Sequence, residues 1–312
     1  MPPLLSPKRS VRKDYDLYKG YVYYAPDVKG MFVLFALLLL GNLLGSMLTA
    51  IFALFMTPGS AATYGMIFAY PAQFLPPMVY CAFKSRQNAL FEPGISLESS
   101  HFKPYSGWML GLLVIVMTAA LSFATDWINY WNYRLTTLTP GMKNFYDAIM
   151  DLMKTMTGGP VWVSVLTVAI MAPVFEEWLC RGEILRGLLQ KMKPGWAIVV
   201  SALFFAVIHM NPWQALNAFI IGCVLGYVYY KTGSLILTML MHATNNGLAV
   251  LMSNIDSLKD VEYFKEIMPA QAYLICTVVS LAIVAGILLL FRSIPLADSR
   301  GNLHRIEEQP MD

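Results

Sequence analysis

Two adjacent glutamates and two histidines stand in apolar stretches of this chain, where ionisable side chains are costly and commonly functional. Glu176 and Glu177 are followed by Arg181, four positions after the second glutamate. On a helix, Glu177 and Arg181 share a face and can form an ion pair, whereas Glu176 points about 100° away. We therefore expect Arg181 to neutralise Glu177, which leaves the Glu176 carboxylate available as a general base. The alternative is that these residues form only the charged end of a membrane helix.

The two histidines favour a shared polar site. His209 follows the apolar run 202–208, and His242 follows the largely apolar run 237–241. A single histidine in a membrane helix often only bridges two helices by a hydrogen bond. Two histidines and a glutamate on three separate helices are better explained by one site. Asn246 lies one turn after His242, so both can face one cavity, where an amide can donate to a developing negative charge.

The elements that must position these groups are membrane helices. Hydrophobic residues make up 57% of the chain and charged residues 13%, about half the charged fraction of a soluble domain. Several stretches reach the ~20 apolar residues needed to cross a bilayer. We predict an all-α, polytopic membrane helix bundle of about eight transmembrane helices around an intramembrane polar cavity. The predicted spans are 31–55, 64–83, 107–125, 161–179, 196–210, 213–230, 235–252 and 270–291.

Lys and Arg residues predict the orientation of the bundle. With the N-terminus inside, most of the 22 basic residues fall in cytoplasmic segments, as the positive-inside rule requires. Both termini are therefore predicted to be cytoplasmic. The basic residues on the outer side are Arg134, Lys143, Lys154, Lys259 and Lys265. This topology accounts for the net charge of +3, so no basic face is left for nucleic acid.

Four segments follow one another along the chain. They are a cytoplasmic basic and aromatic N-terminal segment (1–30), N-terminal membrane helices with an outer amphipathic segment (31–159), the helix bundle that carries the polar groups (160–252), and the last membrane helix with a cytoplasmic tail (253–312). In the outer segment, Phe145, Ile149, Met153 and Met156 recur at helical spacing. This spacing predicts an amphipathic helix that lies on the outer interface.

Three short motifs occur in order on separate apolar helices and together resemble those of a known family. They are Glu176-Glu177-x-x-x-Arg181, Phe205-x-x-x-His209 and His242-x-x-x-Asn246. The family is the CAAX protease and bacteriocin-processing family (CPBP), which includes the CAAX prenyl endopeptidases and the bacterial Abi proteins. The resemblance covers roughly residues 161–252, while the first half of the chain matches only as generic membrane helices.

The resemblance implies an intramembrane endopeptidase and a role for each motif residue. Glu176 with His209 would activate a water for attack on the scissile carbonyl. His242 and Asn246 would stabilise the tetrahedral oxyanion. The supporting residues would be Glu177 and Arg181, which hold the site together, and Phe205, which packs beneath His209. The bacterial branch of the family implies a bacterial plasma membrane as the location.

Metal dependence and substrate are left open by the sequence. Glu176, His209 and His242 are a ligand set that suits catalytic zinc, but HExxH is absent and a glutamate–histidine pair can also activate water without a metal. The resemblance favours the metal-free mechanism. The expected partners are the lipid bilayer and a peptide or membrane-protein substrate, prenylated or not. The alternative function is a non-catalytic immunity or assembly protein of the Abi type, and a proton-coupled transporter is less favoured.

Overall fold

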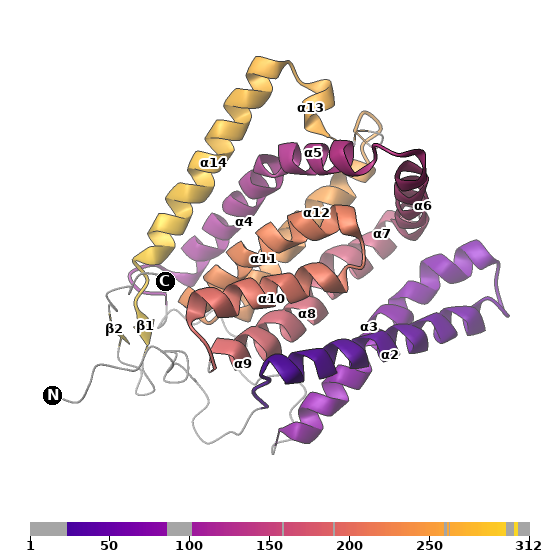
Figure 1. Cartoon of the computed structure of the whole chain (residues 1–312), viewed down its shortest axis with the longest axis horizontal. Helices are drawn as coiled ribbons and strands as arrows, with labels where there is room; N and C mark the ends of the chain where they lie inside the picture. The colour runs from indigo at the N-terminus through magenta and orange to yellow at the C-terminus, as the bar shows by residue number, and fades with distance from the viewer. Residues whose placement is uncertain are drawn as a thin grey trace.

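The computed structural model describes residues 24–85, 102–157, 159–189, 191–258, 261, 263–297 and 303–304, and most of them are helical (Figure 1). In chain order the elements are α2 (Val28–Phe52), α3 (Pro58–Lys84), α4 (Gly107–Ala124), α5 (Asp126–Thr136), α6 (Pro140–Thr157), α7 (Val161–Ser164), the π-helical segment η2 (Val165–Met171), α8 (Ala172–Glu177), the π-helical segment η3 (Trp178–Leu185), α9 (Arg186–Leu189), α10 (Pro194–Ile208), α11 (Pro212–Thr232), α12 (Leu235–Ser253), α13 (Phe264–Ile267), α14 (Ala270–Arg292), β1 (Leu296–Ala297) and β2 (Leu303–His304).

Within the described residues, six helical stretches are long and apolar enough to cross a membrane, so the chain is a multi-pass membrane protein. They are Val28–Phe52, Pro58–Lys84, Gly107–Thr136, Val161–Leu189, Leu235–Ser253 and Ala270–Arg292. The other two predicted spans coincide with α10 and α11. α10 has 15 residues, or about 22 Å of helix against a hydrocarbon core of about 30 Å. The helical membrane bundle is thus confirmed, while the number eight and the intramembrane cavity stay predictions.

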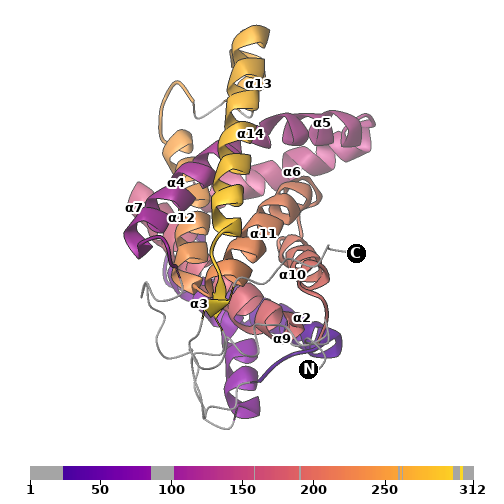
Figure 2. The same cartoon turned by 90° about the vertical axis from the view of Figure 1, so that its left-hand side faces the viewer.

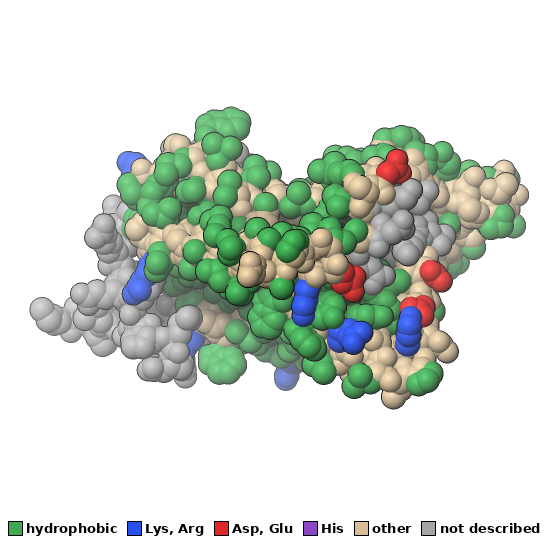
Figure 3. Space-filling model, turned by 90° about the horizontal axis from the view of Figure 1, so that it is seen from above, with side chains coloured by type: hydrophobic (Ala, Val, Ile, Leu, Met, Phe, Trp, Pro, Cys, Tyr) green, Lys and Arg blue, Asp and Glu red, His purple; other side chains and the backbone are tan. Residues whose placement is uncertain are grey.

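Hydrophobic side chains cover most of the face in Figure 3, and charged side chains are few there. Large apolar residues are exposed on the outermost helices, for example Phe32, Leu43 and Met47 on α2 and Leu274 and Val278 on α14. In water such a surface would drive association. Lipid tails are as apolar as these side chains, so the same surface is suited to a bilayer.

Hydrogen-bonding side chains and one glycine define the ends of several helices. Asp27, Ser106 and Ser234 accept hydrogen bonds from backbone N–H groups in the first turns of α2, α4 and α12. Asn211 does the same for α11, with 3.1 Å from its Oδ1 to the nearest backbone nitrogen. These contacts satisfy donors that have no partner within the helix. Gly233 ends α11 in the left-handed conformation, with φ 72°, which a residue without Cβ adopts freely.

The helices form a bundle with the stretch 161–189 in its interior. α14 and α4 pair at one edge and α2 and α3 at the other (Figure 1), and α14 lies nearest the viewer in Figure 2. Between the edges, α12 packs against η2, α8 and α4, α10 packs against η3 and α11, and α3 packs against η2, α7 and α8. Two hydrophobic clusters form the core. One includes residues of the stretch 161–189 with α2, α3, α10 and α11, and the other includes residues of α4, α11, α12 and α14. Segments far apart in the sequence therefore meet at α8.

The helical stretch that begins at Val161 is longer than predicted and ends at Leu189, ten residues after the predicted end at residue 179. The mean hydropathy of residues 180–189 is lowered by Arg181, Glu183 and Arg186. For this reason the sequence predicted that the membrane helix ends before them. In the structure Arg181 is fully buried, and most of the residues around it belong to the core. The alternative of a charged helix end is therefore wrong, because Glu176 lies near the middle of a continuous helix.

Two π-helical segments flank the six residues of α8. At the end of η2 the N–H of Ala172 bonds to the carbonyl of Thr167, five residues earlier. The next residue, Pro173, has no N–H with which to continue this pattern. Segments of π-helix are uncommon and are frequent at functional sites. Here the short α-helical turn between them carries Glu176 and Glu177.

Two glycines allow α2 and α3 to pack backbone to backbone. A Cβ on Gly45 would lie 2.8 Å from the carbonyl oxygen of Ala69, and a Cβ on Gly41 would overlap the carbonyl of Gln73. Glycines four residues apart on a membrane helix permit this kind of close approach. The segment of α3 that they hold, 69–73, includes Tyr70.

Several predicted features lie wholly or partly outside the described residues. Of the N-terminal segment only 24–30 is described, and of the C-terminal tail only the stretch to residue 297 and the short strand β2, which pairs antiparallel with β1. The outer segment forms α5 and α6, in which Phe145 is half-exposed. The side chains of Met153 and Met156 are outside the described residues. The four-segment division of the chain and the position of α6 on the outer interface stay predictions.

Candidate active site

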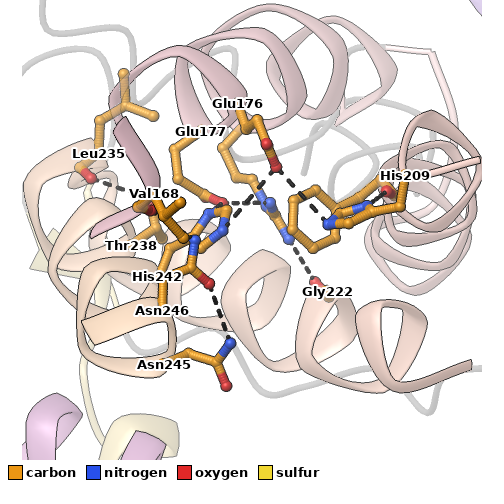
Figure 4. Close-up of polar contacts among 12 residues, drawn as sticks. Val168, Glu176, Glu177, His209, Gly222, Leu235, Thr238, His242, Asn245 and Asn246 are labelled. Atoms are coloured by element: carbon orange, nitrogen blue, oxygen red, sulfur yellow. Dashed lines mark hydrogen bonds and ion pairs between the residues drawn. The ribbon is translucent and has the colours of Figure 1, made fainter. Parts of the chain in front are cut away.

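Glu176 projects from α8 toward histidines on two other helices (Figure 4). Its Oε2 lies 3.9 Å from Nε2 of His209, at the end of α10, and 3.9 Å from Nε2 of His242 on α12. Both separations exceed a hydrogen bond, and no described residue donates one to Oε2. The other oxygen, Oε1, accepts a hydrogen bond of 2.5 Å from the hydroxyl of Tyr70 on α3. One carboxylate oxygen is thus held, and the other faces two imidazoles.

The ring of His209 is oriented by Phe205, one turn earlier on α10. Its Nδ1 lies 2.6 Å from the carbonyl oxygen of Phe205. A carbonyl only accepts hydrogen bonds, so Nδ1 carries a proton, and in the neutral ring the Nε2 that faces Glu176 has a free lone pair. The Phe205 ring meets the imidazole edge to face, with centroids 4.8 Å apart. Phe205 therefore packs against His209 as predicted and also directs its basic nitrogen.

His242 is oriented by the second glutamate of the pair. Its Nδ1 lies 3.0 Å from Oε1 of Glu177, and Nη1 of Arg181 donates to the same oxygen at 2.6 Å. The expected Glu177–Arg181 ion pair is thus present, and both side chains are 0% exposed. Arg181 also donates to the carbonyl of Gly222 on α11 at 3.0 Å and lies over the Phe205 ring, 4.6 Å from its centroid. This buried pair joins the helix stretch 161–189 to α10, α11 and α12.

Asn246 makes a contact that the sequence did not predict. Its Nδ2 donates to the backbone carbonyl of Val168 at 2.9 Å, and this carbonyl lies five residues before Pro173, which offers no N–H. Its Oδ1 accepts from Nδ2 of Asn245 at 3.2 Å, and Oδ1 of Asn245 accepts from the hydroxyl of Ser122 on α4 at 2.9 Å. This chain of hydrogen bonds orients the Asn246 amide and leaves one of its two N–H groups available.

The structure brings the predicted residues together to different degrees. Glu176, His209 and His242 converge at one carboxylate oxygen, whereas the hydrogen bonds described for Asn246 go to Val168 and Asn245. Nothing in the sequence distinguishes Tyr70, which is one of 17 tyrosines in the chain. Its place in the candidate site is seen only from its contact with Glu176, which lies 106 residues later in the chain.

Glu176, His209 and His242 have the donor chemistry of a zinc site. Each histidine is also held through Nδ1 by an oxygen, as metal-bound histidines commonly are. In the part of the chain that the structure describes, however, no three His, Cys, Asp or Glu side chains lie as a metal ion would require. As arranged in the structure, Glu176, His209 and His242 therefore do not form a metal site.

These features define a multi-pass membrane protein in which three helices bring a carboxylate and two imidazoles together. Residues 158–248 match the model of a family described as type II CAAX prenyl endopeptidase Rce1-like. This region belongs to the Rce1-like CAAX protease family, which is a family of proteases. The predicted site residues all fall inside the match, while Tyr70 and Ser122 fall outside it. No match was found among curated proteins or among solved structures.

Proposed function

We propose that this protein is an intramembrane endopeptidase in which Glu176 and His209 activate a water for peptide hydrolysis. The observation that supports this most is the position of Oε2 of Glu176, 3.9 Å from Nε2 of both His209 and His242. A gap of this size between polar groups suits one bridging water. A carboxylate and an imidazole nitrogen with a free lone pair are suited to take its proton.

In the proposed reaction the water oxygen attacks the scissile carbonyl carbon while Glu176, aided by His209, accepts a proton. The new C–O bond turns the carbonyl oxygen into an oxyanion of the tetrahedral intermediate. His242 and Asn246 donate hydrogen bonds to this oxyanion, which lowers the barrier because the donors are already in place. The C–N bond then breaks, and the proton held by Glu176 passes to the leaving nitrogen.

The hydrogen bonds around His242 and Asn246 are compatible with oxyanion binding. Nδ1 of His242 already carries a proton toward Glu177, so donation through Nε2 requires a doubly protonated ring. Asn246 would donate through the N–H that its bond to the backbone carbonyl of Val168 leaves available.

Purified protein in lipid vesicles tests the proposal with a quenched fluorogenic peptide that ends in a CAAX sequence. We expect Glu176→Gln and His209→Gln to abolish cleavage while thermal stability and yield stay at wild-type values. Glu266→Gln is the matched control, because Glu266 is exposed on α13. Wild-type rates in either the Glu176 or the His209 variant would show the mechanism to be wrong.

The same assay addresses the substrate. A farnesylated peptide and its unprenylated counterpart of identical sequence are compared for kcat/KM. Preference for the farnesylated peptide would assign the protein to prenylprotein processing, and equal rates would assign it to ordinary peptides or membrane segments. We also propose the topology with both termini cytoplasmic in a bacterial plasma membrane, which single-cysteine labelling from each side of the membrane tests.

A further inference from the structure

We infer that Tyr70 is a positioning residue of the active site, which holds the Glu176 carboxylate so that Oε2 alone acts as the base. The inference rests on the proposed function and extends it to a part of the chain outside the family match. Tyr70 lies on α3, whereas the match begins at residue 158. Among the described residues of 158–248, none donates a hydrogen bond to Oε1 of Glu176, which accepts from Tyr70.

The contact itself distinguishes the two oxygens of Glu176. The phenolic hydroxyl donates to Oε1 at 2.5 Å, while Oε2 receives no hydrogen bond from any described residue and faces His209 and His242. A carboxylate without this contact is free to rotate and exchange its oxygens. With Oε1 bound, the oxygen that faces the imidazoles is fixed. Hydrogen bonds to charged groups are among the stronger ones in proteins.

Tyr70 is itself held by aromatic packing that reaches the helix of Glu176. Its ring contacts that of Phe74, one turn later on α3, at a centroid distance of 5.6 Å. The Phe74 ring stacks on Phe175 at 5.3 Å, with 19° between the planes, and Phe175 directly precedes Glu176. Stacked aromatic pairs of this kind add stability beyond their buried area. The hydroxyl of Tyr70 and the backbone of α8 are therefore fixed relative to each other.

The packing of α3 against α2 also holds Tyr70 in position. The carbonyls of Ala69 and Gln73, on either side of Tyr70, lie against Gly45 and Gly41. Because this contact is backbone to backbone, α3 cannot slide or rotate along α2 without a clash. The packing of α2 against α3 therefore fixes the position of the Tyr70 hydroxyl. Hence the N-terminal helices contribute to the chemistry and do more than surround the matched region.

The decisive variant is Tyr70→Phe, which removes the hydroxyl and keeps the ring. Tyr64→Phe is the matched control, since Tyr64 lies on the same helix and is 39% exposed. Cleavage of the fluorogenic CAAX peptide is measured in vesicles, with kcat and KM determined separately and thermal stability recorded in parallel. We expect kcat to fall about ten- to a hundredfold, the size of a lost hydrogen bond to a charged group. KM and stability are expected to stay near wild type, and Tyr64→Phe is expected to match wild type throughout.

Three outcomes would overturn the inference. One is a kcat for Tyr70→Phe within twofold of the Tyr64→Phe value. Another is a change confined to KM, which would indicate substrate contact. The third is a loss of activity that matches a loss of folded protein, which would indicate a structural role only. The Glu176→Gln variant keeps the two proposals apart: if it is active, the proposed function fails, and if it is inactive while Tyr70→Phe has full activity, only the inference about Tyr70 fails.

Discussion

Glu177 and His242 are joined across two helices by a hydrogen bond of 3.0 Å between Oε1 and Nδ1. The same carboxylate oxygen accepts from Arg181 at 2.6 Å, and neither Glu177 nor Arg181 is exposed. A buried ion pair recovers the cost of its desolvation only while both partners are present. One oxygen atom therefore makes the burial of Arg181 tolerable and also directs a proposed oxyanion donor.

Loss of Arg181 is expected to destabilise the protein strongly. Arg181→Met leaves the Glu177 carboxylate buried with one partner fewer and should cost about 3–5 kcal/mol of unfolding free energy. Thermal unfolding in detergent would measure this, with Lys143→Met as the control. Lys143 forms the same i,i+4 pair with Asp147, but those side chains are 52% and 48% exposed, so its loss should cost about 0–1 kcal/mol.

The double variant Glu177→Gln/Arg181→Met gives a sharper test of the same pair. Because it removes both charges, it should be more stable than Arg181→Met alone. Equal melting temperatures for Arg181→Met and Lys143→Met would contradict the account of a buried pair.

The Ser122–Asn245–Asn246 chain is expected to influence catalysis from α4. Ser122→Ala removes the donor that fixes Asn245 and should reduce kcat severalfold, with about 0.5–1.5 kcal/mol of stability lost. Peptide cleavage and thermal unfolding are the measurements. Ser46→Ala is the control, because Ser46 is exposed and its hydrogen bond among the described residues goes to a carbonyl of its own helix. If both serine variants behave alike, the orientation of Asn246 does not depend on α4.

Close packing of α2 against α3 is expected to depend on Gly41. Gly41→Ala places a methyl group on the carbonyl of Gln73, and an overpacked contact typically costs about 1–3 kcal/mol. Gly286→Ala is the control, since a Cβ there meets nothing within 4 Å. We expect a lower melting temperature and lower kcat for Gly41→Ala only. A Gly41→Ala protein as stable as Gly286→Ala would contradict the close approach of Gly41 to the carbonyl of Gln73.

Chelation is expected to leave hydrolysis unchanged. The proposed mechanism uses Glu176, His209 and His242 as acid–base and hydrogen-bonding groups, which need no metal. Cleavage is measured before and after treatment with 1,10-phenanthroline, together with metal analysis of the purified protein. Activity that is lost on chelation and restored by zinc would instead support these three residues as zinc ligands.

Much of the site follows from local spacing. The pairing of Glu177 with Arg181 depends on an i,i+4 separation, and such spacing has the same meaning in any helix. The separation of Glu176 from Glu177 into different roles follows from helical geometry in the same way. The end of this helix was predicted wrongly because hydropathy counts Arg181 as a charge, although its pairing with Glu177 removes most of the penalty for burial.

Contacts between distant segments could not be predicted in this way. The hydroxyl of Tyr70 meets Glu176 only because glycines on α2 and aromatic rings on α3 set the position of that helix. The bond from Asn246 to Val168 depends on a π-helical segment whose register is interrupted by Pro173. Neither the π-helical register nor the packing distance between helices is encoded in residue types at a fixed spacing.

The sequence by itself determined that this is a membrane protein of helices, and it singled out the glutamates, histidines and asparagine of the site, because hydropathy and helical period are local properties. The tertiary structure decided which atoms meet. In the folded protein Oε2 of Glu176 faces both imidazoles, Oε1 accepts a hydrogen bond from Tyr70, and Glu177 orients His242. These outcomes depend on how side chains from separate helices pack against one another, and that packing is settled only when the whole bundle is assembled.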